Sequence, residues 1–150
     1  MSLEGLAAKA LELGANKVLI IDRWKGGPGK IELFKVEGGR LQPIPPLIYL
    51  RGVKLRREFG TMPRGRRIKS TVILASPNVP QEVIRLEEML SDFFQIPIAH
   101  VEEECKQYSA VMEISMNEVG EIVVSFRLLP ENVEVGPRMR ISHLIWDLTL

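Results

Sequence analysis

Residues 51–69 carry a dense cluster of positive charge, with the sequence RGVKLRREFGTMPRGRRIK. Eight of these 19 residues are Lys or Arg and one, Glu58, is acidic, so the segment carries about +7. The whole chain carries +1, and the other 131 residues therefore sum to about −6. A local excess of this kind attracts phosphates whatever the charge of distant parts of the chain. The segment predicts a surface that binds a polyanion, and the alternative is a solvated linker between two halves.

The residue types in this segment suit phosphate recognition. Six of the eight cations are arginines, whose planar guanidinium grips phosphate with two hydrogen bonds and stacks on exposed bases. Gly52, Gly60 and Gly65 allow the backbone to approach phosphates closely. The predicted RNA-binding cations are Arg51, Lys54, Arg56, Arg57, Arg64, Arg66, Arg67 and Lys69.

A second basic surface is predicted near the C-terminus. Arg138 and Arg140 alternate on one predicted strand and so point to the same face, which Arg127 on the preceding strand could share. The pair Gly136-Pro137 is expected to stand before that strand and to set its entry. The alternative is an ordinary polar sheet face.

One aromatic residue is a further candidate for contact with bases. Trp24 lies in the turn RWKGGPG and is the aromatic side chain most expected to be exposed. It either stacks on a base or covers a hairpin.

Patterns for catalysis, a metal or a cofactor are weak. The Gly-rich turn at 26–30 lacks the spacing GxxxxGK[ST] and joins two predicted strands, whereas a phosphate loop opens a helix. A nucleotide-handling enzyme would rest on this turn alone. Cys105 and His100 would need to meet in space with a third group, and two His with one Cys do not make a metal site. We therefore expect no enzyme activity, no cofactor and no metal.

The composition indicates a soluble globular chain in a reducing, cytoplasmic compartment. Hydrophobic residues make up 45% and charged residues 26% of the sequence. No apolar run approaches the roughly 20 residues of a membrane span, and the N-terminus lacks the features of a signal peptide. The lone Cys105 excludes an internal disulfide.

Hydrophobic periodicity predicts an α/β (α+β) fold. The expected elements of the first half are a helix at 3–13 and strands at 18–22, 30–36 and 47–55, with loops at 38–39 and 43–46. Those of the second half are strands at 71–75, 96–101, 110–115, 121–129 and 138–144, a helix that begins near Pro80, and a short helix at 102–104. The apolar face of the helix after Pro80 holds Val83, Leu86, Leu90 and Phe93, and its acidic residues Glu82, Glu87, Glu88 and Asp92 are expected largely off that face.

The two halves share an outline of helix, strand, turn, strand and a further strand. This outline predicts two structurally related lobes, each a small mixed sheet with packed helices, of which the first is incomplete. We divide the single domain 1–150 into a first half-lobe at 1–58, a basic connector at 59–69 and a second half-lobe at 70–150.

Several segments, in this order, resemble the Brix-domain family of ribosome-biogenesis factors in its short archaeal form. The helix, strand and Gly-rich hairpin of the family match LAAKALELGANKVLIIDRWKGGPGKIELFKV, and its strand leading to Gly and basic residues matches LIYLRGVKLRREFG. The strand–helix unit matches TVILASPNVPQEVIRLEEMLSDFF. The C-terminal signature, implicated in RNA binding, matches IVVSFRLLPENVEVGPRMRISHLIW.

The resemblance implies two related α/β lobes and a non-catalytic role in ribosome assembly. The implied partners are ribosomal RNA or pre-rRNA, together with ribosomal or assembly proteins, and no membrane. By position, the resemblance assigns Arg51, Lys54, Arg56 and Arg57 to the basic surface, and Gly136, Pro137, Arg138 and Arg140 to the RNA-linked motif. The alternative is a protein-interaction scaffold, in which the acidic helix at 82–92 and a sheet edge dock a partner and the basic segment is a linker.

The sequence departs from the family at its start. Family members usually begin with a strand, a helix and another strand before the helix that opens this sequence. Loss of that segment would expose a strand edge or an apolar face in the first lobe. We therefore expect reduced stability or self-association through this face, and a lower RNA affinity than the family implies.

Overall fold

A computed structural model describes residues 2–24, 27–54 and 68–148 of the chain. It divides into two compact units, the first formed by residues 1–51 and 142–150 and the second by residues 52–141. The strands follow the hydrogen-bonding order β1-β2-β3-β8-β7-β6-β4-β5, and β3 and β8 run through both units. With eight strands and two α-helices in the described residues, the fold is mixed α/β, as the sequence predicted.

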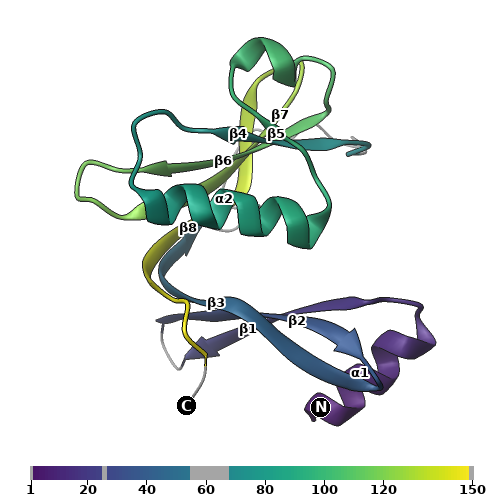
Figure 1. Cartoon of the computed structure of the whole chain (residues 1–150). Coiled ribbons are helices and arrows are strands. Elements are labelled where there is room, and N and C mark those ends of the chain that lie inside the picture. Colours follow the sequence, from purple (N-terminus) through teal and green to yellow (C-terminus); the bar gives the residue numbers. More distant parts are fainter. Residues whose placement is uncertain (1, 25–26, 55–67, 149–150) are drawn as a thin grey trace. The chain divides into compact units, whose positions relative to one another are not determined.

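The first unit is an antiparallel sheet with one α-helix (Figure 1). Its order is β1-β2-β3, and α1 contacts β2. The elements are α1 (Leu3–Glu12), β1 (Lys17–Trp24), β2 (Gly27–Glu37), β3 (Arg40–Lys54) and the end of β8 (Val133–Ile145).

Local signals determine both ends of α1, and the predicted helix is confirmed. The Ser2 Oγ accepts a hydrogen bond from the Gly5 N–H at 3.0 Å, which satisfies one of the free amides of the first turn. At the other end Gly14 has φ +72°, and the Ala15 N–H donates to the Ala10 carbonyl at 2.8 Å. This is the Schellman arrangement that glycine favours.

The predicted loop at 43–46 is wrong, because β3 begins at Arg40 and runs through the prolines. Ile31 pairs with Ile48 and Leu33 pairs with Ile44, so the register with β2 shifts at this point. Pro45 and Pro46 lie in the shifted stretch. Proline lacks the N–H of a regular ladder but is tolerated in a bulge, where that ladder is interrupted.

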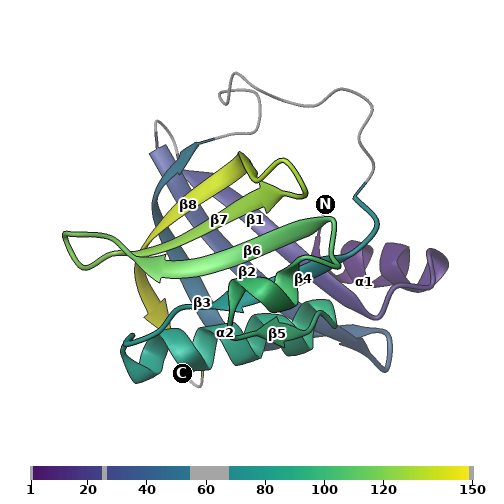
Figure 2. The same cartoon turned by 90° about the horizontal axis from the view of Figure 1, so that it is seen from above.

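The second unit is a mixed sheet with a helix on each face. β4 pairs in parallel with β5 and β6, and β6, β7 and β8 pair antiparallel, in the order that Figure 2 shows. The elements are β4 (Thr71–Ala75), α2 (Gln81–Phe94), β5 (Ile98–Ala99), the 3-10 helix η2 (Glu102–Cys105), β6 (Ala110–Met116), β7 (Ile122–Leu128) and most of β8. α2 runs along one face of this sheet and η2 lies over the other (Figure 1).

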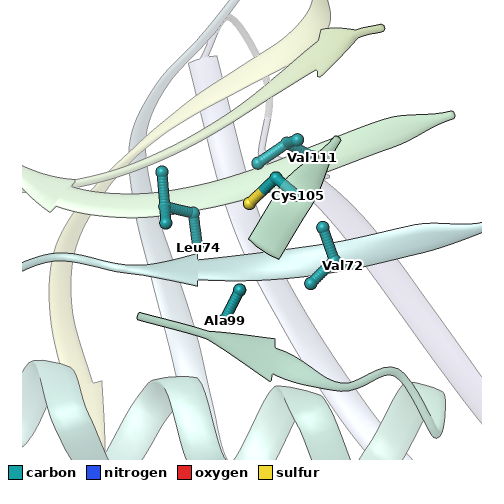
Figure 3. Close-up of a cluster of buried hydrophobic side chains, with 5 residues drawn as sticks. All are labelled: Val72, Leu74, Ala99, Cys105 and Val111. Carbon is teal, nitrogen blue, oxygen red and sulfur yellow. The ribbon is translucent and has the colours of Figure 1, made fainter. Parts of the chain in front are cut away.

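The face under η2 has its own hydrophobic cluster, shown in Figure 3. Its buried members are Val72, Leu74, Ala99, Cys105 and Val111. The strand predicted at 96–101 shortens to Ile98–Ala99. The chain turns into η2 at His100, whose N–H donates to Glu104 Oε1 at 3.1 Å.

The buried face of α2 includes a carboxylate that the sequence analysis placed off it. Val83, Leu86, Leu90 and Phe93 are buried as predicted, but Glu87 is also buried, with 3% of its surface exposed. Glu87 lies four residues after Val83 and three before Leu90, so helical spacing itself brings it onto this face. Its Oε2 accepts a hydrogen bond from the Ser76 N–H at 3.1 Å. Burial raises the pKa of Glu87 above 4.5, more than this bond lowers it.

None of the helices among the described residues is long and apolar enough to cross a membrane.

We predict that Glu87→Gln stabilises the protein at neutral and alkaline pH. Because the folded-state pKa is raised, the charged carboxylate costs stability above that pKa, and the cost disappears as the pH falls below the unfolded value near 4.5. Glutamine keeps the acceptor for Ser76 and carries no charge. Thermal unfolding should therefore give a higher Tm for the variant at about pH 8 and equal values at about pH 4.

Glu118→Gln, at an exposed position in a turn of the same unit, is the matched control, and its Tm should follow the wild type at both pH values. A Glu87→Gln variant that gains stability only in acid would contradict the assignment.

Candidate nucleic-acid interface

The basic segment connects β3 to β4, two strands that are not neighbours in the sheet. β3 ends at Lys54 and β4 begins at Thr71, and β8, β7 and β6 lie between them in the sheet. Since neighbouring strands are about 4.8 Å apart, the two strand ends are separated by about 19 Å across the sheet. Lys54 and Lys69, which flank the connection, are both exposed. An exposed lysine therefore lies at each of the two points where this connection joins the sheet.

Several predicted site residues lie outside the described part of the chain. These are Arg56, Arg57, Arg64, Arg66 and Arg67. The backbone of Trp24 ends β1, but its side chain is also outside the described residues. Arg51 is described, lies in β3 in the first unit and is exposed.

A pair of serines holds the point at which the basic segment enters β4. The Ser109 Oγ accepts hydrogen bonds from the N–H groups of Lys69 and Ser70, both at 2.9 Å, and donates to the Ser70 carbonyl at 2.8 Å. The Ser109 N–H donates to the Ser70 Oγ at 3.2 Å. The backbone at Lys69 is thus fixed to the start of β6, while its side chain points to solvent.

Arg140 of the C-terminal motif lies against the first glycine of the basic segment. A Cβ atom on Gly52 would lie 2.5 Å from Arg140 Nη2 and 2.9 Å from Nε, so the guanidinium occupies the space that the glycine leaves free. On its other side Arg140 Nη1 is 3.6 Å from Glu121 Oε1, which accepts a hydrogen bond from Asn117 Nδ2 at 3.0 Å. The Arg140 side chain remains 49% exposed. The two predicted basic motifs therefore meet at Gly52.

Arg138 is engaged by a carboxylate of its own strand. Its Nε donates to Glu134 Oε2 at 2.6 Å and its Nη2 donates to the other oxygen, which raises the pKa of Arg138. This two-point pairing neutralises most of the charge of Arg138 in place.

Arg127 is more deeply held. Its Nη2 is 3.0 Å from Glu102 Oε1, its Nε is 3.5 Å from Glu113 Oε2, and its Nη1 donates to Asn132 Oδ1. Only 14% of the side chain is exposed. Val123 pairs with Arg140, and cross-strand partners point to the same face of a sheet. Arg127 is four residues after Val123 in β7, so it points to this face as well. Arg127, however, faces carboxylates, and Arg140 largely faces solvent.

The expectation that Gly136-Pro137 precedes the last strand is wrong, since β8 begins at Val133. Val124 pairs with Met139 and Phe126 pairs with Val135, so four residues of β8 span the place of two in β7. Gly136, which is buried, and Pro137, which is exposed, lie in this bulge. A bulge re-aims the side chains that follow it, here those leading to Arg140.

The geometry gives no support to a Cys–His pair. Cys105 is buried in the cluster of Figure 3, and burial raises the pKa of its thiol. His100 is exposed on the loop before η2. Among residues 2–24, 27–54 and 68–148, no group of three or more His, Cys, Asp or Glu is arranged to hold a metal ion.

The sequence analysis missed the residues that position these cations. Ser109 acts on a segment 39 and 40 residues away, and Asn117 and Glu121 act through a strand register that no local pattern reveals. In the first unit His143 stacks on Tyr49, with ring centroids 4.4 Å apart, a contact that joins β8 to β3.

We predict opposite consequences for two alanine substitutions on the same face. Arg127→Ala removes the packing and the charge-assisted contacts of a mostly buried guanidinium, so it should lower the free energy of unfolding by about 1–3 kcal/mol. Arg140→Ala removes a half-exposed side chain with a long ion pair and should change it by less than about 0.5 kcal/mol. Urea unfolding measures both, and equal losses would contradict this division of roles.

Known proteins support the fold at the level of structure. No family model matches the sequence, and no curated protein matches it. A probable ribosomal biogenesis protein from Aeropyrum pernix K1 is similar over 100% of this chain and 78% of its own, with 23% identity and a TM-score of 0.74. Mil, an archaeal Imp4-like protein, is similar over 98% of this chain and 78% of its own, with 15% identity and a TM-score of 0.56. The chain therefore has the fold of these two proteins.

Proposed function

We propose that this chain is a ribosome biogenesis factor that binds ribosomal RNA or pre-rRNA through its basic surfaces and catalyses no reaction. The observation that carries the proposal is the position of Arg140, whose guanidinium lies against Gly52 at the start of the basic segment. Two motifs some 90 residues apart thus contribute cations to one surface. The fold shared with a probable ribosomal biogenesis protein and an Imp4-like protein supports the role.

The binding we propose is mainly electrostatic. Arg51, Lys54, Lys69 and Arg140 are exposed, and with the five arginines of 56–67 they would contact phosphates. Arg127 and Arg138 are already paired with carboxylates, so we assign them, with Gly136 and Pro137, to shaping the strand that presents Arg140. Single-stranded or bulged RNA would supply any selectivity, through bases stacked on arginine or Trp24.

The same proposal includes the organisation expected from the sequence. The two compact units would correspond to two related lobes, with residues 59–69 as the connector between the half-lobes. The site of action would be the cytoplasm.

Reversing the charge of Arg56, Arg57, Arg66 and Arg67 to Glu should abolish binding to ribosomal RNA fragments without unfolding the protein. The wild type should bind with strong salt dependence, because each phosphate contact on a single strand contributes about 0.7 to the slope of log K against log salt. Four such contacts would account for about 3 of the wild-type slope. Fluorescence anisotropy at low and moderate salt measures both.

A matched control reverses four exposed cations elsewhere, Lys9, Lys35, Arg40 and Lys106, with the same change in net charge. Binding that survives in the first variant, or is lost equally in the control, would contradict the assignment to the basic segment.

A second candidate function, protein interaction, is favoured by the edge of the first unit. Among the described strands β1 pairs only with β2. Leu19 and Ile21 of β1 stand opposite the buried Leu33 and Ile31 of β2, yet they are 37% and 58% exposed. The apolar face of the sheet therefore continues onto an uncovered edge strand, a site for pairing with another chain. We propose that a second copy of this chain pairs there.

Sedimentation velocity should therefore show a concentration-dependent dimer. Ile21→Lys places a charge on the edge and should give a monomer, while Val119→Lys, on an exposed turn of the second unit, should leave the dimer unchanged. A monomeric wild type at high concentration would rule out self-association.

A further inference from the structure

A shallow pocket lies beside the place where the basic segment ends, within the second unit. Its volume is about 420 Å³, within the range of small-ligand pockets. It is formed where β4 and β6 begin and where α2 leads into β5. Ile68 and Lys69, the last residues before Ser70, form part of its wall. Lys69, the last cation of the basic segment, therefore lies at the pocket.

The lining suits a flat apolar group with polar edges. Ile68, Ile96 and the half-buried Tyr108 supply apolar and aromatic surface. The Gln95 amide and the Thr71 hydroxyl supply hydrogen-bonding groups. This combination is typical of sites that stack a base and bind its edge.

The α2 side of the pocket does not suit a phosphate. α2 ends at Phe94, and the carbonyl groups of its last turn give this end a partial negative charge. Gln95 and Ile96, which follow directly, line the pocket. This partial charge disfavours an anion at the α2 side of the pocket and does not affect a neutral base, while the one cation among the described lining residues, Lys69, belongs to the basic segment.

The walls are held in place without a ligand. The Tyr108 N–H donates to the Cys105 carbonyl at 3.0 Å, and its side chain packs on the cluster of Figure 3. Gln95 Nε2 donates to the Asp92 carbonyl at 2.6 Å, and the Ile96 N–H donates to the Ser91 carbonyl at 3.0 Å. A preformed pocket loses little conformational entropy when it is filled.

We propose that this pocket receives one nucleobase of an RNA strand whose phosphates lie along the basic segment, with the base against Tyr108. The inference rests on the proposed function, which it deepens by adding a base-binding site to a surface that otherwise contacts phosphates. Trp24 and the arginines predicted from the sequence to stack on bases lie elsewhere in the chain.

The test compares two single-stranded probes of equal length and charge, an oligouridylate and the same strand without bases. Stacking of one base on an aromatic side chain is worth roughly tenfold in affinity. Tyr108→Ala should therefore reduce the preference of the protein for the base-bearing probe roughly tenfold, while the salt dependence stays unchanged. Tyr108→Phe keeps the ring and should keep the preference.

Because Tyr108 also packs on the core, Tyr108→Ala could unfold the protein, and a second variant in the same pocket is needed. Ile68→Ala removes a side chain at the pocket that is 47% exposed and should lower the same preference severalfold. Val101→Ala, exposed and outside the pocket, is its control. Photocrosslinking of an oligouridylate carrying one 4-thiouridine should label Tyr108 in the wild type.

The outcomes separate this inference from the function it rests on. If the wild type binds neither probe, the proposed function fails. If both probes bind and the four-arginine reversal abolishes binding, but Tyr108→Ala and Ile68→Ala leave the base preference unchanged, then the function stands and the pocket does not take a base. The last result would also fit a pocket that takes a side chain of a partner protein.

Discussion

The mutual hydrogen bonding of Ser70 and Ser109 is the contact on which the second unit depends. It joins the start of β4 to the start of β6, and so aligns the central parallel pair from Thr71 opposite Ala110 onward. From this register follow the burial of Val72 beside Val111 and the packing of Cys105 over both. It also fixes the backbone at the end of the basic segment. The end of the basic segment is therefore fixed beside a buried hydrophobic cluster.

Features determined by residues close in the sequence could be predicted, and features that depend on strand register could not. Ser2, Gly14 and the apolar spacing of α2 are local, so both ends of α1 and the start of α2 were predicted within one residue. Prolines at 43–46 and 137 are also local signals for a break, but register shifts place them inside strands. Glu87 was predicted to lie off the buried face of α2 because it is charged, although its helical spacing places it on that face. The Ser76 N–H, just after β4, provides the hydrogen bond that a buried carboxylate needs.

The candidate site shows the same division. A count of charges is enough to find the basic segment, and motif spacing is enough to find Arg138 and Arg140. Which arginine is already neutralised depends on carboxylates brought close by the sheet and by η2, such as Glu102 and Glu113 beside Arg127. No pattern in the sequence distinguishes Arg127 from Arg140, because their partners lie up to 25 residues away along the chain. The role of Gly52 was also not that expected, since its missing side chain makes room for Arg140.

The irregular stretches of β3 and β8 contain the same number of extra residues. In each, four residues of one strand cover the place of two in its neighbour, an excess of two. Successive side chains alternate between faces, and Val135 before the irregular stretch of β8 and Ile141 after it are both buried. The bulge thus takes up the extra residues locally and leaves the core face of β8 the same on both sides. It adds length to β8 without changing the face on which Arg140 lies.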